Sequence, residues 1–463
     1  MRVLFVRPDS RMVMAPMPLG LGYIAQALRD NRNDTVEILD GRNLGLSSAQ
    51  ILKRIRDFGP DVVGITATIM DSREMHDVAT MTKRECPSVK VIVGGPYVSS
   101  SATTVMQNES IDVAVIGEGE ASIVELLNAL EENETNLAKI DGIVYRENGE
   151  VHTTSPRKPA QNLDDIRPAW DLLNPRAYFS RFKRNSHNRI RKDHRVVAFF
   201  SSRGCPYNCI FCHNVFGKKI RYMSAESVID EITQLVERYG IRELEFVDDC
   251  FNQNAERAKK IFREIIARKF NLHITFPNGL RGDRIDEELL DLFKEAGVFR
   301  ISYAVEAASP RVQKLIKKKL DLEKVKKTIS ATAERGIFTV GFFIMGFPTE
   351  TAEEMKMTVD FALESDVHIA DFFYLAPYPG TEVSKMAGLD ARNVSYSDFS
   401  DISVNLSAAT DEELHNMAKY AYRKFYLDPR RIARILRVVP KNMHLVLNAI
   451  ITARLLFQDA VAR

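Results

Sequence analysis

The chain has 463 residues, its 64 Lys and Arg nearly balance 62 Asp and Glu, and 45% of its residues are hydrophobic. This length suggests about three domains of roughly 150 residues each. The composition is that of a globular protein and excludes disorder and collagen-like fibres. The formal net charge of +2 gives no electrostatic reason to expect a nucleic-acid partner. Five cysteines in so long a chain exclude a small disulfide-held scaffold.

The apolar runs are too short for export or membrane insertion. Residues 1–6 are too short an apolar run for a signal peptide. The longest apolar stretch, at 336–347, has the length of a buried strand rather than of a membrane span. Together with the small number of cysteines, these features predict a cytoplasmic protein.

The first segment, 1–149, alternates short β-rich runs with amphipathic helical runs. Strands are predicted at 2–6, 36–39, 62–65, 90–93 and 113–116, and helices near 20–31, 47–58, 71–84 and 120–131. This α/β alternation predicts a doubly wound domain with a parallel sheet, which binds ligands at the carboxyl ends of its strands. The loops expected there are rich in Gly and Pro, at 15–20, 94–96 and 117–120.

The second segment, 150–195, has no clear periodicity and several prolines, and it is predicted to be an extended linker over the surface. Its basic residues are Arg181, Lys183, Arg184, Arg189, Arg191, Lys192 and Arg195. A solvated loop is favoured for this run over a contact with an anionic substrate.

A second alternation fills the third segment, 196–380. Strands are predicted at 196–201, 243–247, 273–277, 299–304, 339–345 and 371–375, with helices between them, for example at 225–239 and 286–296. Six β/α units predict a partial (β/α)6 barrel of the TIM type, with an active site at the carboxyl ends of the strands.

The last segment, 381–463, is predicted to be helical from about residue 405. An interrupted apolar helix at 444–457 follows Arg430, Arg431, Arg434 and Arg437. Such a helix either covers the barrel, which is favoured, or lies on a membrane surface. In the second case the protein would be peripheral to the inner face of the membrane.

The most specific motif is a Cys205-x3-Cys209-x2-Cys212 loop directly after the first predicted barrel strand. Three thiolates are one ligand short of a closed zinc site or a fully ligated four-iron cluster. A cluster with three cysteines keeps one iron open for a substrate or cosubstrate. Zinc with His213 as fourth ligand is disfavoured, because His213 directly follows Cys212. Cys86 and Cys250 stand alone and are interpreted as ordinary thiols.

This loop, with Phe211 before its last cysteine, resembles the signature of the radical S-adenosylmethionine (SAM) superfamily. The resemblance implies a [4Fe–4S] cluster held by Cys205, Cys209 and Cys212, whose open iron binds the amino and carboxylate groups of SAM. It also implies one-electron cleavage of SAM to methionine and a 5′-deoxyadenosyl radical, with a flavodoxin- or ferredoxin-type electron donor.

The same resemblance implies SAM-binding residues at the ends of the following strands. They are Phe211, Asp248, Asp249, Arg281, Ser302, Glu306 and Gly346. Asp248-Asp249 replaces the commoner Gly-Gly-Glu, so the contact to the methionine ammonium is assigned to this pair without a choice between them. Arg281 and Glu306 are the best candidates for the ribose and carboxylate contacts. The 377–382 segment resembles the turn after the sixth strand.

Both halves together resemble the cobalamin-binding subgroup of that superfamily, which includes radical C-methyltransferases and the anaerobic Mg-protoporphyrin monomethyl ester cyclase. The resemblance implies a flavodoxin-like cobalamin domain whose contact residues are Pro18, Leu19, Gly20, Thr66, Gly94, Gly95, Tyr97, Gly117, Glu118 and Gly119. The Asp-x-His-x-x-Gly motif is absent, and neither His76 nor His152 is a convincing cobalt ligand. A degenerate module that only docks against the barrel is the alternative.

The favoured function is a cobalamin-dependent radical SAM enzyme that methylates an unactivated carbon of a small molecule, lipid or tetrapyrrole. The alternative is cyclisation or oxidation of the anaerobic tetrapyrrole cyclase type, whose Phe-Val-Asp-Asp-x-Phe strand end is similar to 246–251. A methylthiotransferase is less favoured, because the N-terminal segment has only Cys86 and the chain has no terminal RNA-binding barrel. A non-catalytic binding protein would have no use for the cysteine loop.

Overall fold

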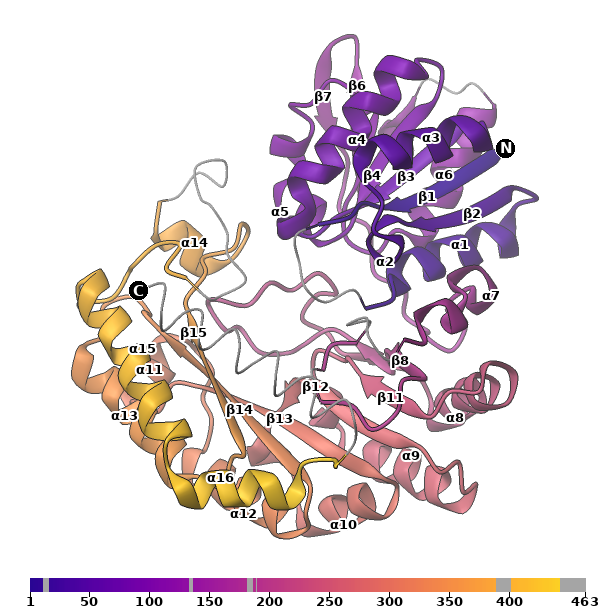
Figure 1. Ribbon diagram of the computed structural model, residues 1–463. Coiled ribbons are helices and arrows are strands. Elements are labelled where there is room, and N and C mark those ends of the chain that lie inside the picture. Colours follow the sequence, from indigo (N-terminus) through magenta and orange to yellow (C-terminus); the bar gives the residue numbers. More distant parts are fainter. Residues whose placement is uncertain (11–15, 133–135, 181–185, 189, 389–400, 442–463) are drawn as a thin grey trace. The chain divides into compact units, whose positions relative to one another are not determined.

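A computed structural model describes residues 1–10, 16–132, 136–180, 186–188, 190–388 and 401–441. The chain forms two compact units (Figure 1). Unit 1 comprises Met1–Pro175, Ser202–Met223 and Ala376–Val404, and unit 2 comprises Arg176–Ser201, Ser224–Leu375 and Asn405–Arg463. The cysteine loop thus belongs to the same unit as the N-terminal segment. The segment boundaries after residues 149, 195 and 380 stay predictions.

Unit 1 is built on a seven-stranded sheet in the order β2-β1-β3-β4-β5-β6-β7. Its strands are β1 (Arg2–Arg7), β2 (Thr35–Asp40), β3 (Val62–Thr66), β4 (Lys90–Gly94), β5 (Val113–Val115), β6 (Ile143–Glu147) and β7 (Glu150–Thr153). The first five pair in parallel in the flavodoxin-like order, which confirms the predicted α/β fold. The antiparallel pair β6 and β7 extends the sheet and was not expected.

Helices cover both faces of this sheet. They are α1 (Leu19–Asn31), α2 (Gly41–Leu44), α3 (Ser48–Phe58), α4 (Ser72–Glu85), α5 (Pro96–Val105), α6 (Glu120–Glu131) and α7 (Trp170–Leu173). A short helix late in the chain, α14 (Glu382–Met386), also belongs to unit 1. One core cluster joins α1 and α6 to the sheet through residues such as Leu28 and Leu126. The other joins α3, α4 and α5 through residues such as Met75 and Val98. The sequence predicted a loop where α5 begins, because Gly94-Gly95-Pro96 resembles a turn, yet proline fits the first position of a helix.

The predicted surface linker is only partly on the surface. Leu163, Ala169, Trp170 and Leu173 are buried, and the backbone N–H of Ala169 donates to the Gly22 carbonyl of α1 (3.0 Å). Apolar side chains at irregular spacing give no periodic signal, so the sequence pattern missed this contribution to the core of unit 1.

Unit 2 is built on an open sheet of six parallel strands in the order β15-β14-β13-β12-β11-β8. They are β8 (Val196–Phe199), β11 (Glu243–Phe246), β12 (His273–Leu280), β13 (Val298–Glu306), β14 (Phe338–Met345) and β15 (Ile369–Tyr374). Helices α8 (Ala225–Gln234), α9 (Ala255–Ala267), α10 (Glu287–Glu295), α11 (Pro310–Leu315), α12 (Leu322–Glu334) and α13 (Ala352–Glu364) lie along one side of it (Figure 1). This arrangement confirms the partial barrel.

The end of the predicted linker is buried against charged side chains of β11. Glu245 accepts hydrogen bonds from Ser186 Oγ (2.5 Å) and Asn188 Nδ2 (2.6 Å). Arg191 is buried, and burial lowers its pKa. The solvated-loop interpretation is therefore wrong for Arg191. Of the other basic residues, Arg181, Lys183, Arg184 and Arg189 lie outside the described residues.

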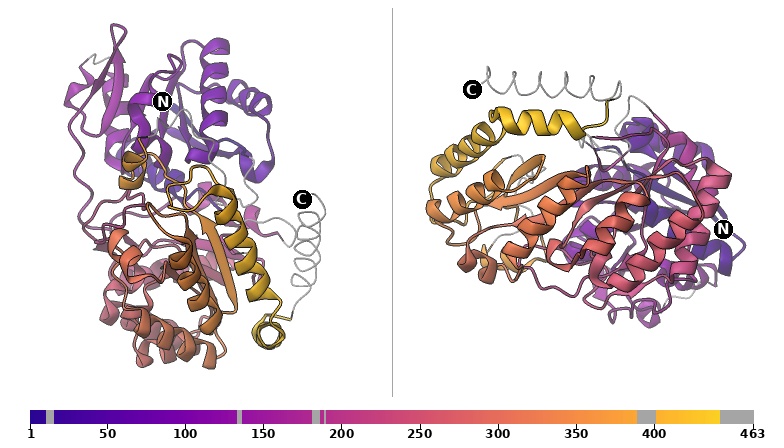
Figure 2. Two further views of the ribbon diagram at one scale, coloured as in Figure 1. Left: turned by 90° about the vertical axis from the view of Figure 1, so that its left-hand side faces the viewer. Right: turned by 90° about the horizontal axis from the view of Figure 1, so that it is seen from below.

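From residue 405 on, the described helices of the C-terminal segment are α15 (Asp411–Tyr426) and α16 (Pro429–Val438) (Figure 2). The hydroxyl of Tyr422 donates to the Phe372 carbonyl (3.1 Å) and that of Tyr426 to the Ala370 carbonyl (3.1 Å), so α15 covers the edge strand β15. The helix expected at 444–457 lies outside the described residues. Among the described helices, none has the length and apolar character needed to cross a bilayer.

Candidate active site

The three cysteines lie on a loop closed at its base by a short ladder. β9 (Ser202–Arg203) pairs antiparallel with β10 (Arg221–Tyr222). Inside the loop, the backbone N–H of Cys205 donates to the Gly217 carbonyl (3.2 Å), and that of Cys212 donates to the Cys209 carbonyl (3.2 Å). Cys205 and Cys209 are partly exposed, Cys212 is exposed, and none of the three forms a disulfide bond. Phe211, between the last two, is partly exposed.

Gly204 determines how the loop leaves this ladder. Its φ is +95°, and a Cβ at this position would lie 2.6 Å from the Lys219 carbonyl oxygen. Since both the backbone conformation and the space exclude a side chain, glycine is required where the two ends of the cysteine loop cross.

The donor chemistry of the loop fits a four-iron cluster better than a zinc ion. Zinc needs ligands that converge at about 2.0–2.3 Å, and no group of three or more His, Cys, Asp or Glu side chains converges in this way among the described residues. A four-iron cluster binds each thiolate through a different iron, so its cysteines need not converge on one point. His213, the fourth ligand of the zinc alternative, is partly buried, and burial lowers its pKa.

The turn after the sixth barrel strand lies beside the cysteine loop within unit 1. The backbone N–H of Val383 in α14 donates to the Ile210 carbonyl (2.9 Å). A Cβ at Gly380 would lie 3.2 Å from the Ser100 side chain and 3.8 Å from the His213 ring. This turn therefore supports the cysteine loop from the side of α5.

At the end of β11, the structure separates the two neighbouring aspartates. Asp248 is buried, and its Oδ1 accepts hydrogen bonds from the backbone N–H (3.1 Å) and hydroxyl (2.8 Å) of Ser201 after β8. Asp249 is exposed. Asp248 thus ties two strand ends together, while Asp249 presents its carboxylate to solvent.

Arg281, after β12, is buried with its guanidinium engaged on two sides. It forms an ion pair with Asp283 (2.8 Å) and donates to the carbonyls of Lys318 (3.0 Å) and Lys319 (3.2 Å). Its own carbonyl accepts from Asn252 Nδ2 (2.8 Å). These contacts make Arg281 a brace between the β12 end and the loop before α12.

Strand β13 carries two further predicted residues, Ser302 at its middle and Glu306 at its end. Glu306 is buried, has a φ of +68° and pairs with Lys318 Nζ (3.0 Å). The hydroxyl of Ser302 is buried and has no hydrogen-bond partner among the described residues. An orphaned hydroxyl on a strand that leads to the predicted ribose site fits a missing polar ligand.

Glu350 supports the backbone directly after β14, where the predicted SAM-binding residue Gly346 lies. Its Oε2 accepts hydrogen bonds from the backbone N–H of Gly346 (2.8 Å) and of Phe347 (3.0 Å). The side chain is fully buried, and this burial raises the pKa of Glu350 to about 7. The Gly346 backbone is therefore held by a carboxylate that the sequence pattern did not reveal.

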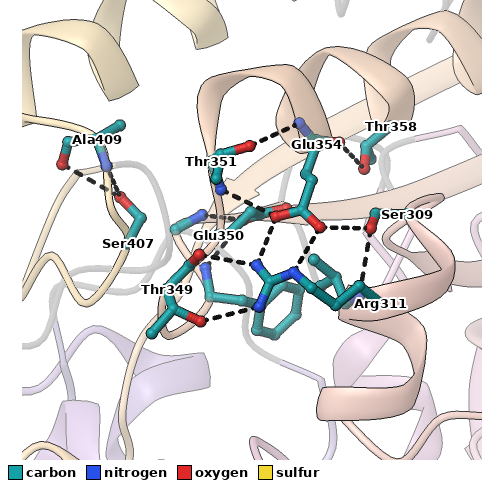
Figure 3. A network of polar contacts seen from close by, with 12 residues as sticks. Ser309, Arg311, Thr349, Glu350, Thr351, Glu354, Thr358, Ser407 and Ala409 are labelled. Atoms are coloured by element: carbon teal, nitrogen blue, oxygen red, sulfur yellow. Dashed lines mark hydrogen bonds and ion pairs between the residues drawn. The ribbon is translucent and has the colours of Figure 1, made fainter.

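A polar network fixes the turn around Glu350 (Figure 3). Arg311 forms an ion pair with Glu354 (2.5 Å) and donates to the Thr349 carbonyl (2.8 Å). Ser309 Oγ donates to Glu354 Oε1 (2.8 Å), and the Ala408 backbone N–H donates to the Glu350 carbonyl (2.9 Å). The ends of α11 and α13 and the segment before α15 thus share one rigid joint.

In the N-terminal sheet, the predicted cobalamin contacts gather at the carboxyl ends of parallel strands. Thr66 ends β3, Gly94 ends β4 and Gly95 follows, while Gly117 comes after β5. The backbone N–H of Ala67 donates to the Gly94 carbonyl (3.2 Å), and that of Gly117 donates to Ser99 Oγ (2.9 Å). Pro18, Leu19 and Gly20 open α1, and Gly119 precedes α6.

Two of the glycines at this edge are not crowded by other protein atoms. A Cβ added at Gly20 or at Gly117 would meet nothing within 4 Å. Tyr97, in contrast, is buried in the core, and its hydroxyl lies 3.4 Å from His76 Nε2. His76 also contacts Asn108 through Nδ1 (3.1 Å), so both ring nitrogens face protein groups. His152 lies on β7.

Comparisons with known proteins bear on this arrangement. A model of the radical SAM superfamily matches residues 199–362, and a model of the B12 binding domain matches residues 14–127. An uncharacterised methyltransferase of Pyrococcus horikoshii is 34% identical over 447 residues, which cover 93% of each chain. The chain belongs to the radical SAM superfamily. It is one of the members with a B12-binding domain, which confirms the resemblance inferred from the cysteine loop.

Other relatives of this radical SAM protein include both methyltransferases and cyclases. The anaerobic magnesium-protoporphyrin IX monomethyl ester cyclase of Rubrivivax gelatinosus is 25% identical over 440 residues, 92% of this chain and 78% of that enzyme. The structure of the radical SAM methyltransferase TsrM from Kitasatospora setae superposes with a TM-score of 0.71 at 21% identity. That match covers 93% of this chain and 84% of that chain, and it shows a shared fold.

Several residues of the site escaped the sequence pattern. Ser201, Arg203 and Arg221 act through partners that are distant along the chain. Glu350 instead binds backbone N–H groups only three and four residues before it. None of the four belongs to a periodic or spaced motif. The one available signal was indirect: one arginine lies on each side of the cysteine loop, Arg203 before it and Arg221 after it.

Proposed function

We propose that this chain is a cobalamin-dependent radical SAM methyltransferase that methylates an unactivated carbon of a small molecule, lipid or tetrapyrrole. The observation that carries the proposal is the closed loop with three cysteines that form no disulfide bond, within the region matched by the radical SAM model. The glycine-lined strand ends within the region matched by the B12-binding model support the second cofactor.

The residues present fit these cofactors. Cys205, Cys209 and Cys212 would hold a [4Fe–4S] cluster. When bound, the cluster, SAM and cobalamin supply reductive SAM cleavage, a radical that abstracts hydrogen, and a transferable methyl group. The protein contributes orientation and the exclusion of water and oxygen. A flavodoxin- or ferredoxin-type protein would supply the electron.

Asp249 is the better candidate of the acidic pair for the SAM ammonium. Its carboxylate is exposed, whereas the Asp248 carboxylate accepts two hydrogen bonds from Ser201. A charge-assisted hydrogen bond from an ammonium needs an accessible carboxylate. The Ser302 hydroxyl and the braced Gly346 backbone are the matching candidates for the ribose and adenine contacts.

Cobalamin would lie over the open backbone at Gly20 and Gly117. We do not expect His76 to bind the cobalt, because its two ring nitrogens face Tyr97 and Asn108. A visible spectrum without an axial imidazole would agree with this assignment.

Cyclisation or oxidation of a tetrapyrrole remains the second candidate, supported by the likeness to the anaerobic cyclase over most of the chain. The mass of the product separates the two reactions. A gain of one methylene supports methyl transfer, while loss of hydrogens or gain of oxygen supports the cyclase. A cytoplasmic location and a peripheral membrane contact stay predictions.

The test is anaerobic reconstitution with iron and sulfide, followed by titration with hydroxocobalamin. The chain is expected to bind about four irons, as one [4Fe–4S] cluster requires, and one cobalamin in a saturable titration. Cys209→Ala should lose the cluster and SAM cleavage but keep cobalamin binding. Cys86→Ala, which removes a thiol outside the loop, should keep all three. A wild-type protein with a reducible cluster but no cobalamin binding would overturn the cobalamin part of the proposal.

A further inference from the structure

The base of the cysteine loop contains an unfavourable pair of like charges. Arg203 of β9 and Arg221 of β10 stand directly opposite each other in the antiparallel ladder. Both are buried, each with 4% of its surface exposed. Like charges at directly opposed positions destabilise a ladder, and buried charges are costly unless they are paired. The loop therefore needs counter-charges to stay closed.

Two glutamates between the end of β5 and the start of α6 supply these counter-charges. Arg221 binds both carboxylate oxygens of Glu118, with an Nη1–Oε2 distance of 2.9 Å. Arg203 pairs with Glu118 Oε2 (3.2 Å) and with Glu120 Oε1 (2.8 Å). The side chains of Glu118 and Glu120 are 7% and 16% exposed. Two buried guanidinium groups thus meet two largely buried carboxylates, so the cluster of four charges is balanced.

Further contacts make this cluster a joint rather than a single ion pair. The Arg203 guanidinium lies 4.6 Å from the centre of the Tyr23 ring of α1 and 5.3 Å from that of Phe216 in the cysteine loop. Arg221 also donates to the carbonyls of Ala160 (2.7 Å) and Phe216 (3.1 Å). Burial acts to lower the pKa of Arg203, but the charges of Glu120 and Glu118 help to hold it above its usual range.

We infer that Glu118 and Glu120 are positioning residues of the cluster site: they hold the base of the cysteine loop closed and connect it to the strand-end turn at Gly117–Gly119. This inference rests on the proposed function, because it assigns the loop to a cluster. It also changes the role expected for Glu118, whose carboxylate binds two arginines rather than facing a cofactor. The N-terminal domain is then required for a stable cluster as well as for cobalamin.

Glu118→Gln tests the inference, with Glu125→Gln as the matched control. Glu125 lies on α6, and its carboxylate pairs with Arg157 while 45% exposed. The readout is the rate at which an iron chelator bleaches the reconstituted cluster of the full-length protein. Loss of one buried carboxylate leaves two buried arginines against Glu120, so bleaching should accelerate at least roughly tenfold in Glu118→Gln. The control should stay within about twofold, as expected for an exposed ion pair.

The double variant Glu118→Gln/Arg221→Gln separates charge balance from loss of a contact. It leaves Arg203 paired with Glu120, so its bleaching rate should return toward that of the wild type. Equal bleaching rates in Glu118→Gln and Glu125→Gln would overturn the inference, as would a double variant that bleaches faster than Glu118→Gln.

A second readout does not depend on the cluster. Lys218 and Lys219 are exposed inside the loop, so trypsin cleavage of the apo protein after these residues reports on the base of the loop. Glu118→Gln should be cleaved there several-fold faster than wild type and Glu125→Gln should not, and unchanged cleavage would contradict the inference. If the wild-type protein binds no cluster while apo Glu118→Gln is still cleaved faster than apo Glu125→Gln, the proposed function is contradicted and the inference about the loop base is not.

Discussion

The carboxyl ends of the parallel strands carry different chemical groups in the two units. In unit 1, the strand ends at Thr66, Gly94 and Gly117 present backbone and small groups, and the backbone at Gly117 faces open space. In unit 2, the strand ends carry charged side chains that are already paired, such as Arg281 with Asp283 and Glu306 with Lys318. The same α/β edge thus supports two kinds of binding surface.

This difference matches the ligands proposed for the two edges. A large ring that is contacted over its face needs close, uncharged backbone, which glycine allows. A small zwitterion needs charged and polar groups held in fixed positions before it binds, because ordering them afterwards costs free energy. The predictions below separate these two designs.

The largest effect on stability is expected from Gly95→Ala, at the carboxyl edge of the unit 1 sheet. Gly95 has φ 97° and ψ −175°, a conformation that is essentially limited to glycine. An added Cβ would lie 2.7 Å from Thr66 Oγ1 and 2.9 Å from the Ala67 carbonyl oxygen. The free energy of unfolding should fall by about 3 kcal/mol, and cobalamin affinity should fall with it. Urea unfolding and hydroxocobalamin titration measure the two quantities.

Gly59→Ala is the matched control for that variant. Gly59 also has a positive φ, at 61°, but a Cβ there would meet nothing within 4 Å. Its cost should be about 1 kcal/mol, without a change in cobalamin affinity. If both variants lose equal stability, close packing at Gly95 is not what shapes this edge.

In the charged edge, the stability contributed by Glu350 should depend on pH. Burial raises its pKa to about 7 in the folded protein, from 4.5. Between these values the folded state holds a proton that the unfolded state has released, so stability falls as pH rises from about 4.5 to 7 and then levels off. The loss is at most about 3 kcal/mol. Glu350→Gln should remove this part of the pH dependence, and denaturant unfolding at a series of pH values would detect it.

Replacing Asp248 or Asp249 with alanine should affect different properties: the first lowers stability, and the second lowers SAM affinity. Asp248→Ala leaves two hydrogen-bond donors of Ser201 without their acceptor, and should cost about 2 kcal/mol of unfolding free energy. Asp249→Ala changes an exposed side chain, so stability should change by less than about 0.5 kcal/mol. SAM affinity should nevertheless fall roughly tenfold or more.

Equilibrium dialysis with SAM and urea unfolding would measure both aspartate variants. Unchanged SAM affinity in Asp249→Ala would reassign the ammonium contact to Asp248. In that case the Asp248 carboxylate would both bind SAM and stabilise the fold.

The smallest effect is expected at the outer edge of the unit 2 sheet. The Tyr426 hydroxyl bonds both the carbonyl (3.1 Å) and the backbone N–H (3.3 Å) of Ala370. Tyr426→Phe should lower the free energy of unfolding by about 1 kcal/mol and speed hydrogen exchange in β15. Tyr420→Phe, on an exposed face of the same helix, should change neither, and equal effects would show that the hydroxyl does not protect the edge strand.

Much of the fold could be predicted from local patterns in the chain. The five parallel strands of unit 1 lie within one residue of their predicted ends, because alternating apolar runs and helical periodicity are local properties. The β6–β7 pair and α5 were missed. Strands β6 and β7 are short, and β7 is mostly exposed, while the Gly-Gly-Pro sequence before α5 favours a turn as well as a helix start.

The sequence by itself determined the cysteine spacing, the glycines at the strand ends and hence the family. These features depend on neighbours within a few residues, where covalent spacing sets geometry. Only the tertiary structure decided which charges meet and which are buried: Glu118 binds Arg221 across 103 residues, and Asp248 rather than Asp249 is buried. Burial makes such pairs specific, because an unpaired charge away from water is too costly to keep, and burial exists only once the chain has folded.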